Sequence, residues 1–161
     1  MSEMYVRIVR LEPMRVISAL GFGPSPEDQA WKMLMAWAKQ HEQLDDIGTH
    51  RFFGFNNPNP SPGSPNYGYE QWMTVDDTQQ PEGELRIIEF MGGLYAVARC
   101  KGVEQIYQTW QQLAAWPEDS HYKYGSHLCL EECLTPQMFV SGETPSVYEE
   151  AQFDLYLPIV E

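Results

Sequence analysis

The sequence has few basic residues, and this limits the partners that it can bind. Lys and Arg number 10 against 23 Asp and Glu, for a formal net charge of −13. Nucleic-acid binding relies on clustered Lys and Arg that contact phosphates, so we expect no direct DNA or RNA partner. The charge favours cationic or neutral partners, or it serves solubility alone.

Signals for membrane insertion and export are also missing. The chain has no run of about 18 apolar residues, so we expect no membrane-spanning helix. Its first residues, MSEMYV, lack the basic and apolar segments of a signal peptide. The three cysteines, an odd number, indicate reduced thiols. We therefore expect a cytoplasmic protein, and 161 residues suffice for one domain with a core.

What the sequence does contain is an internal repeat. The apolar pattern of YVRIVRLEPMRVISALG matches that of ELRIIEFMGGLYAVARC. Three residues also recur 79 positions later: Trp31, Leu34 and Trp37 match Trp110, Leu113 and Trp116. The repeat predicts one domain over 1–161 that contains two similar units, about residues 4–80 and 84–161.

Each unit is predicted to contain strands and one helix. In the first unit we expect strands at 5–11, 15–20, 50–55 and 67–75, and a helix from Ser25 to about residue 40. In the second we expect strands at 85–90, 94–99, 127–134 and 153–160, and a helix over about 104–115. The predicted fold class is α+β, with two units that share one core across a pseudo-two-fold axis.

The stretch YGYEQWMTVDD, residues 67–77, places an acid among strand-forming aromatic residues. Side chains alternate along a strand, so Glu70 and Trp72 are predicted to point the same way. Matching this strand to HLCLEECL sets Glu70 against Glu131. Two carboxylates in an aromatic cleft need positive compensation, and basic residues are scarce. A cationic, apolar small molecule would supply it, whereas a solvent-facing Glu70 is the alternative.

The candidate ligand-binding residues are Glu131, Glu70, Trp72, Tyr69, Cys133, Trp110 and Phe55. We expect Glu131 to be the counter-ion and Glu70 a second acid. Trp72 and Tyr69 are expected to provide a stacking surface.

Metal binding and nucleophilic catalysis have less support. His127, Cys129, Glu131 and Cys133 alternate along one predicted strand, but neighbours on one face lie roughly 6.6–7 Å apart. Four such residues in a row cannot hold one ion, and no C-x-x-C or H-E-x-x-H motif completes a site. No G-x-S-x-G motif is present. We expect no metal and no cofactor.

Together these stretches resemble the GyrI-like (gyrase-inhibitor-like) effector-binding domain, which is also the drug-binding module of AraC-type and multidrug-responsive regulators. The resemblance covers about residues 4–160 and rests on VRIVRLEPMRVISALGFGP, Trp31–Ala38, YGYEQWMTVDD, GGLYAVARCKG, LEECL and FDLYLPI, in that order. It implies two pseudo-two-fold-related β-α-β-β units whose antiparallel sheets form a central ligand cleft. It also implies binding of bulky, often cationic aromatic ligands beside a central Glu in an E-x-Y strand. That Glu falls on Glu131, and the aromatic position is Cys133.

The resemblance leaves three interpretations of the function open. A stand-alone module for cationic, amphipathic ligands is the first, because no helix-turn-helix segment precedes residue 4. Some relatives resemble hydrolases of reactive cyclopropane-type compounds, in which Glu131 or Glu70 would be a general base. The third is an interaction module for a separate transcription regulator. We favour the binding module over an enzyme.

Overall fold

The computed structural model describes residues 4–45, 47–57, 59–140 and 145–161. The chain divides into two compact units. We call Met14–Phe90 the central unit, and Met1–Pro13 with Met91–Glu161 the terminal unit. The first strand therefore belongs with the second half of the chain, not with the strand that follows it.

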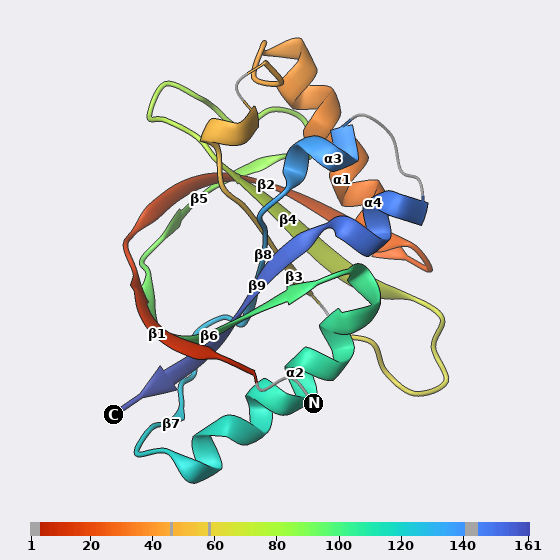
Figure 1. The fold of residues 1–161 in the computed structure, drawn as a ribbon. Coiled ribbons are helices and arrows are strands. Elements are labelled where there is room, and N and C mark those ends of the chain that lie inside the picture. Colours follow the sequence, from red (N-terminus) through yellow and green to blue (C-terminus); the bar gives the residue numbers. More distant parts are fainter. Residues whose placement is uncertain (1–3, 46, 58, 141–144) are drawn as a thin grey trace. The chain divides into compact units, whose positions relative to one another are not determined.

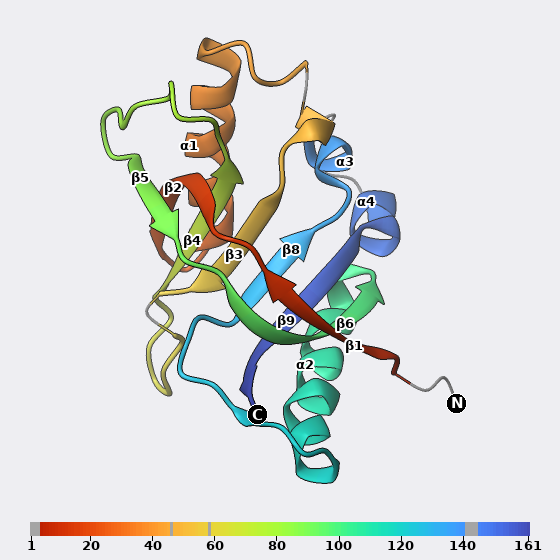
Figure 2. The ribbon, with the colours of Figure 1, turned by 90° about the vertical axis from the view of Figure 1, so that its left-hand side faces the viewer.

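The central unit is an antiparallel sheet with one long helix. Its strands are β2 (Met14–Gly23), β3 (Phe52–Asn56), β4 (Tyr67–Thr74) and β5 (Arg86–Phe90), in the order β5-β2-β4-β3. A 3-10 turn, η1, spans Ile47–Thr49. Helix α1 (Pro26–Gln40) begins with Pro26 and acids in its first turn, which suit a helix N-terminus. It packs on β2 and β4 (Figure 2), and its buried residues include Ala30, Leu34, Trp37 and Ala38.

The terminal unit has a corresponding sheet. Its strands are β1 (Val6–Leu11), β6 (Gly93–Lys101), β8 (Leu130–Cys133) and β9 (Gln152–Val160), in the order β1-β6-β9-β8, with β7 (Lys123–Tyr124) paired to β9. Helix α2 (Ile106–Ala115) lies between the turns η2 (Val103–Gln105) and η3 (Trp116–Asp119), and α3 (Pro136–Val140) and α4 (Pro145–Glu150) precede β9. Figure 1 shows β1 beside β6.

In both units the helix covers one face of the sheet. In the terminal unit α2 packs on a core that includes Ala98, Leu155 and Ile159. Because side chains alternate, Asp154 and Tyr156 lie on the opposite face of β9. The same alternation in the central unit separates Ile17 and Ala19 from Ser18. The helix-free faces are those that carry the buried acids described below.

The predicted α+β class with antiparallel sheets is confirmed, and both units contain the β-α-β-β order, β2-α1-β3-β4 and β6-α2-β8-β9. The pairing of the early strands differs from the sequence order. β1 pairs with β6 and β2 pairs with β5, although Glu12-Pro13 and Gly92-Gly93 look like hairpin turns. The contact-based units therefore begin and end at other residues than 4–80 and 84–161. An apolar pattern specifies that a segment is a strand, but not which strand it pairs with.

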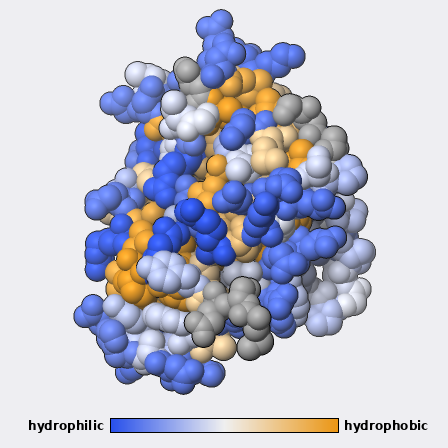
Figure 3. Space-filling model, viewed as in Figure 1, coloured by the Kyte–Doolittle hydropathy of each residue, from blue (hydrophilic) through white to orange (hydrophobic). Residues whose placement is uncertain are grey.

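Helices α3 and α4 were not predicted, because each is too short for a recognisable helical period. None of the helices in the described part of the chain has both the length and the apolar character needed to cross a bilayer. The face of the molecule drawn in Figure 3 is mainly hydrophilic, with smaller apolar patches.

Candidate functional site

Glu70, near the middle of β4, is a buried carboxylate with several donors around it. Only 3% of its surface is exposed, and 1% of that of Trp72. Its Oε2 accepts hydrogen bonds from the Ser18 hydroxyl at 2.9 Å and from the Trp72 indole Nε1 at 3.1 Å. The prediction that Glu70 and Trp72 share a face is confirmed, and the solvent-facing alternative for Glu70 is wrong.

The other oxygen of Glu70 meets an amide and a cation. Oε1 accepts from Asn57 Nδ2 at 2.7 Å and from Arg86 Nη2 at 3.2 Å. The Arg86 side chain remains 59% exposed while that of Glu70 is 4% exposed. Although basic residues are scarce in the sequence, this acid does have a positive partner within the chain. Arg86 makes the longest of the four contacts.

Aromatic rings surround this acid on one face of the central sheet. Phe55 lies opposite Glu70 in the β3–β4 register, and its ring meets Trp72 edge-on at 5.1 Å between centroids. Phe90 tilts against Trp72 at 5.4 Å. Tyr69, as Glu70's direct neighbour, points to the other face, where a Cβ on Gly54 would collide with its hydroxyl. Phe55, Glu70 and Trp72 thus come together, and Tyr69 does not join them.

The remaining predicted residues lie together in the terminal unit. Trp110 of α2 donates from Nε1 to Glu131 Oε2 at 3.0 Å. Cys133 packs against the same core, on the α2 side of β8. Glu131, Cys133 and Trp110 therefore form a group on the helix-covered face of their sheet.

The sequence alignment that set Glu70 against Glu131 is wrong. Within its unit β4 pairs with β2, and Leu20 lies opposite Glu70. Arg99, 79 residues after Leu20, lies opposite Asp154 of β9. The counterpart of Glu70 by strand position is therefore Asp154, whereas β8 corresponds to β3. The alignment failed because HLCLEECL also has an acid among apolar residues, and pattern alone does not reveal the pairing.

Sequence reasoning missed a second buried acid cluster, on the helix-free face of the terminal unit. Glu132 and Asp154 lie opposite each other in the β8–β9 register and are 6% and 3% exposed. The Tyr156 hydroxyl donates to Glu132 Oε1 at 2.6 Å. The ring of Tyr95 meets that of Tyr156 edge-on at 5.5 Å, and burial raises the pKa of Tyr95 above its ordinary value. Two acids and two phenol rings thus share one face.

Asp154 is compensated by two arginines. Arg7 of β1 reaches its Oδ2 at 2.8 Å, and Arg99 of β6 contacts its two oxygens at 2.8 and 3.2 Å. The hydrogen bond with Asp154 raises the pKa of Arg99. A sequence signal for this cluster exists, because Glu70-Gln71-Trp72 recurs in form as Asp154-Leu155-Tyr156. In both segments an acid is followed two residues later by an aromatic residue, and matching this spacing would have aligned Glu70 with Asp154.

The cysteines are poor nucleophiles. Burial raises the pKa of the Cys133 thiol to about 11. The pKa of Cys129 is raised by burial and then by the Glu131 charge, and burial also raises that of Cys100. All three thiols are protonated at neutral pH. Within the described ranges, no three His, Cys, Asp or Glu side chains gather as metal ligands.

The fold and the matching family together define the class of this protein. It is a small-molecule effector-binding domain of the GyrI-like type, which confirms the resemblance found in the sequence. The chain belongs to the family of integron-associated effector binding proteins, whose model matches residues 7–159. No curated protein matches the chain significantly.

Solved structures share this fold at low sequence identity. The EcmrR C-terminal domain has a TM-score of 0.72 at 13% identity, with 98% of each chain covered. In an EcmrR–DNA complex the match spans 58% of the EcmrR chain. A hydrolase from Listeria innocua has a TM-score of 0.68 at 11% identity, covering 96% of this chain and 91% of that one. SAV2435 bound to tetraphenylphosphonium has a TM-score of 0.54 at 10% identity, covering 98% and 94%.

Proposed function

We propose that this protein binds cationic, amphipathic small molecules that carry aromatic rings. The observation that supports this most is the presence of buried carboxylates beside aromatic rings on the helix-free face of each sheet. A carboxylate out of water attracts a cation more strongly than one in solvent, and aromatic faces add cation–π attraction. Such a surface suits a flat or bulky organic cation better than a hydrated metal ion.

Glu132 is the acid that we assign as the principal counter-ion. It is buried, it accepts a hydrogen bond from Tyr156, and Tyr95 lies beside that ring. Glu131, the residue favoured by sequence, faces α2 and the Trp110 indole instead. The assignment therefore moves by one residue, which reverses the face of the strand.

Glu70 is the second acid of the proposal, with Trp72 and Phe55 as its aromatic neighbours. Its contact with Arg86 is the longest of four, and the arginine is largely solvated. A ligand cation can take the place of Arg86 at Oε1, because the released guanidinium returns to water at little cost. Ser18, Trp72 and Asn57 would keep the carboxylate in position during this exchange.

The comparisons support this choice of ligand. SAV2435, which shares the fold, is bound to tetraphenylphosphonium in its structure, and that compound is a cation that carries phenyl rings. The net charge of −13 attracts cations toward the surface. Both observations agree with an organic cation as the effector.

The test compares two neighbouring acids on opposite faces of β8. Affinity for a cationic rhodamine and for a neutral analogue is measured by fluorescence on Glu132→Gln and on Glu131→Gln. We expect Glu132→Gln to weaken the cationic dye roughly 30- to 1000-fold, equivalent to about 2–4 kcal/mol, and the neutral dye little. Glu131→Gln is the matched control and should change both affinities by less than about threefold. Equal losses for the two dyes would exclude charge pairing, and a larger effect of Glu131→Gln would return the role to that residue.

A second assay distinguishes hydrolysis of a ligand from binding alone. An electrophilic cyclopropane compound is incubated with the protein and then recovered. We expect unchanged compound and at most stoichiometric protection. Catalytic turnover that is lost in Glu132→Gln would instead identify a general base and contradict the binding-only proposal.

A further inference from the structure

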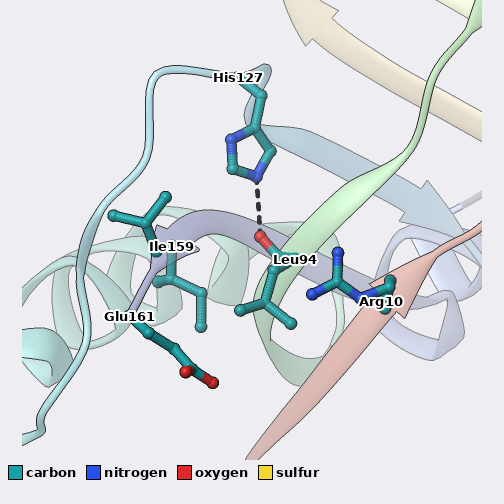
Figure 4. Close-up of a pocket in the computed structure, with 6 residues that line it drawn as sticks. Arg10, Leu94, His127, Ile159 and Glu161 are labelled. Atoms are coloured by element: carbon teal, nitrogen blue, oxygen red, sulfur yellow. Dashed lines mark hydrogen bonds between the residues drawn. The ribbon is translucent and has the colours of Figure 1, made fainter.

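A hollow lies in the terminal unit. It encloses about 390 Å³ and is lined by Arg10, Leu94, His127, Ile159, Val160 and Glu161 (Figure 4). We call it the Arg10 pocket. Leu94 and Ile159 belong to the α2 side of the sheet, whereas Asp154 and Tyr156 lie on the other side. None of its six lining residues is among those assigned to the effector site, although the His127 ring contacts Tyr95.

Arg10 is exceptional among the arginines of this acidic chain. Arg7, Arg15, Arg86 and Arg99 each pair with a carboxylate, and Arg51 lies over the Phe53 ring. Among the described residues, Arg10 is the one arginine whose side chain makes no hydrogen bond, ion pair or ring contact. Its guanidinium points toward the pocket beside Leu94 in Figure 4. With 23 acids in the chain, a guanidinium without a carboxylate leaves its donors for another anion.

One wall of the pocket is fixed in place by His127. Its Nε2 lies 2.8 Å from the Leu94 carbonyl, and because a carbonyl only accepts, this nitrogen carries the proton. The ring also meets Tyr95 edge-on at 4.9 Å. Gly93 and Gly125 leave it room, since a Cβ at Gly93 would approach the ring to 2.8 Å. The imidazole is thus held by four neighbours, and the pocket keeps a defined wall.

We propose that the Arg10 pocket binds a small monocarboxylate with an apolar tail. The planar guanidinium matches a carboxylate with two parallel hydrogen bonds. Leu94, Ile159 and Val160 provide an apolar surface for the tail, and 390 Å³ falls in the range of small-molecule sites. Glu161 also lines the pocket, and its negative charge disfavours a dianion more strongly than a monocarboxylate. This site goes beyond the proposed cation binding and does not depend on it.

The test uses octanoate as the probe, with octanol as its uncharged analogue, and titrates both into the protein by calorimetry and NMR. Arg10→Gln should weaken octanoate roughly tenfold, the size of a charge-assisted hydrogen-bond pair, and leave octanol unchanged. Lys32→Gln removes one positive charge from the exposed face of α1 and is the matched control, expected to leave octanoate affinity unaltered. Val160→Asp, at a position 45% exposed, should weaken octanoate at least as much without affecting folding.

Four results would overturn the proposal. These are no octanoate binding to the wild-type protein, equal affinity for octanol, equal losses in Arg10→Gln and Lys32→Gln, or competition between octanoate and a cationic rhodamine. Independent binding of the two probes supports a separate site. If rhodamine fails to bind while octanoate binds through Arg10, the effector proposal fails and the Arg10 pocket stands.

Discussion

At the scale of single residues, the stability of the fold depends on how a buried acid is paired with its more exposed arginine partners. Asp154 is buried, while the side chains of Arg7 and Arg99 are 36% and 54% exposed. Removing the acid leaves two cations that water can solvate. Removing both cations leaves a carboxylate in a dry environment, which is the more costly change.

We therefore expect an asymmetry between two sets of variants. Arg7→Met with Arg99→Met should lower the free energy of unfolding by about 3–5 kcal/mol, whereas Asp154→Asn should lower it by about 1–2 kcal/mol. Urea denaturation followed by tryptophan fluorescence measures both. Equal losses of stability would contradict this argument and would mean that water reaches the Asp154 carboxylate once the arginines are removed.

Residue-level prediction from sequence succeeded where only alternation was needed. Glu70 and Trp72 were correctly placed on one face because they are two residues apart in a strand. The choice between Glu131 and Glu132 was beyond the sequence, because both follow a buried Leu130 and only α2 packing tells the faces apart. Arg86 was also missed as a partner of Glu70, since the β2–β5 and β2–β4 registers bring them together and neither register is visible in the sequence.

At the scale of elements, the approach of α1 to β2 depends on one small residue. Gly21 lies on the helix side of β2, and a Cβ there would collide with the backbone carbonyl oxygen of Pro26. A backbone atom cannot swing aside as a side-chain end can. The first turn of α1 would have to lift from the sheet to accommodate any larger residue.

Gly21→Ala is therefore expected to destabilise the protein by about 2–3 kcal/mol, or roughly 4–12 °C in Tm. Gly48→Ala is the control, because a Cβ at Gly48 meets nothing within 4 Å and its change should stay within about 0.5 kcal/mol. Thermal unfolding by circular dichroism compares the two. A Tm for Gly21→Ala as high as that of Gly48→Ala would show that α1 is not tightly seated on β2.

Element types were largely predictable, and their partners were not. The long strands and both long helices were foreseen because period-two and period-3.6 patterns are visible over six or more residues. β1 pairs with β6 and β2 pairs with β5, and the partners in each pair are separated by about 80 residues in the sequence. The internal repeat does not indicate which of these distant strands pair.

At the scale of the whole molecule, the charge of −13 acts before any contact forms. A negative field concentrates cations near the surface and speeds their association, and salt screens it. The association rate of a cationic rhodamine should therefore fall several-fold between about 20 and 300 mM NaCl, while the dissociation rate changes little. Stopped-flow fluorescence separates the two rates, with the neutral analogue as control. If the association rate of the neutral dye falls by a similar factor, the effect of salt does not arise from screening of the attraction between the protein and the cation.

The membership of β1 in the terminal unit has a consequence for the order in which the chain can fold during synthesis. All strands of the central unit have been made once residue 90 has left the ribosome, so this unit can assemble early. β1 is made before the central unit but must wait for β6, and the sheet it joins remains open until β9, which pairs with both β6 and β8, is complete. β1 thus finds its place only after the whole central unit has been made, and its apolar residues stay uncovered during that interval.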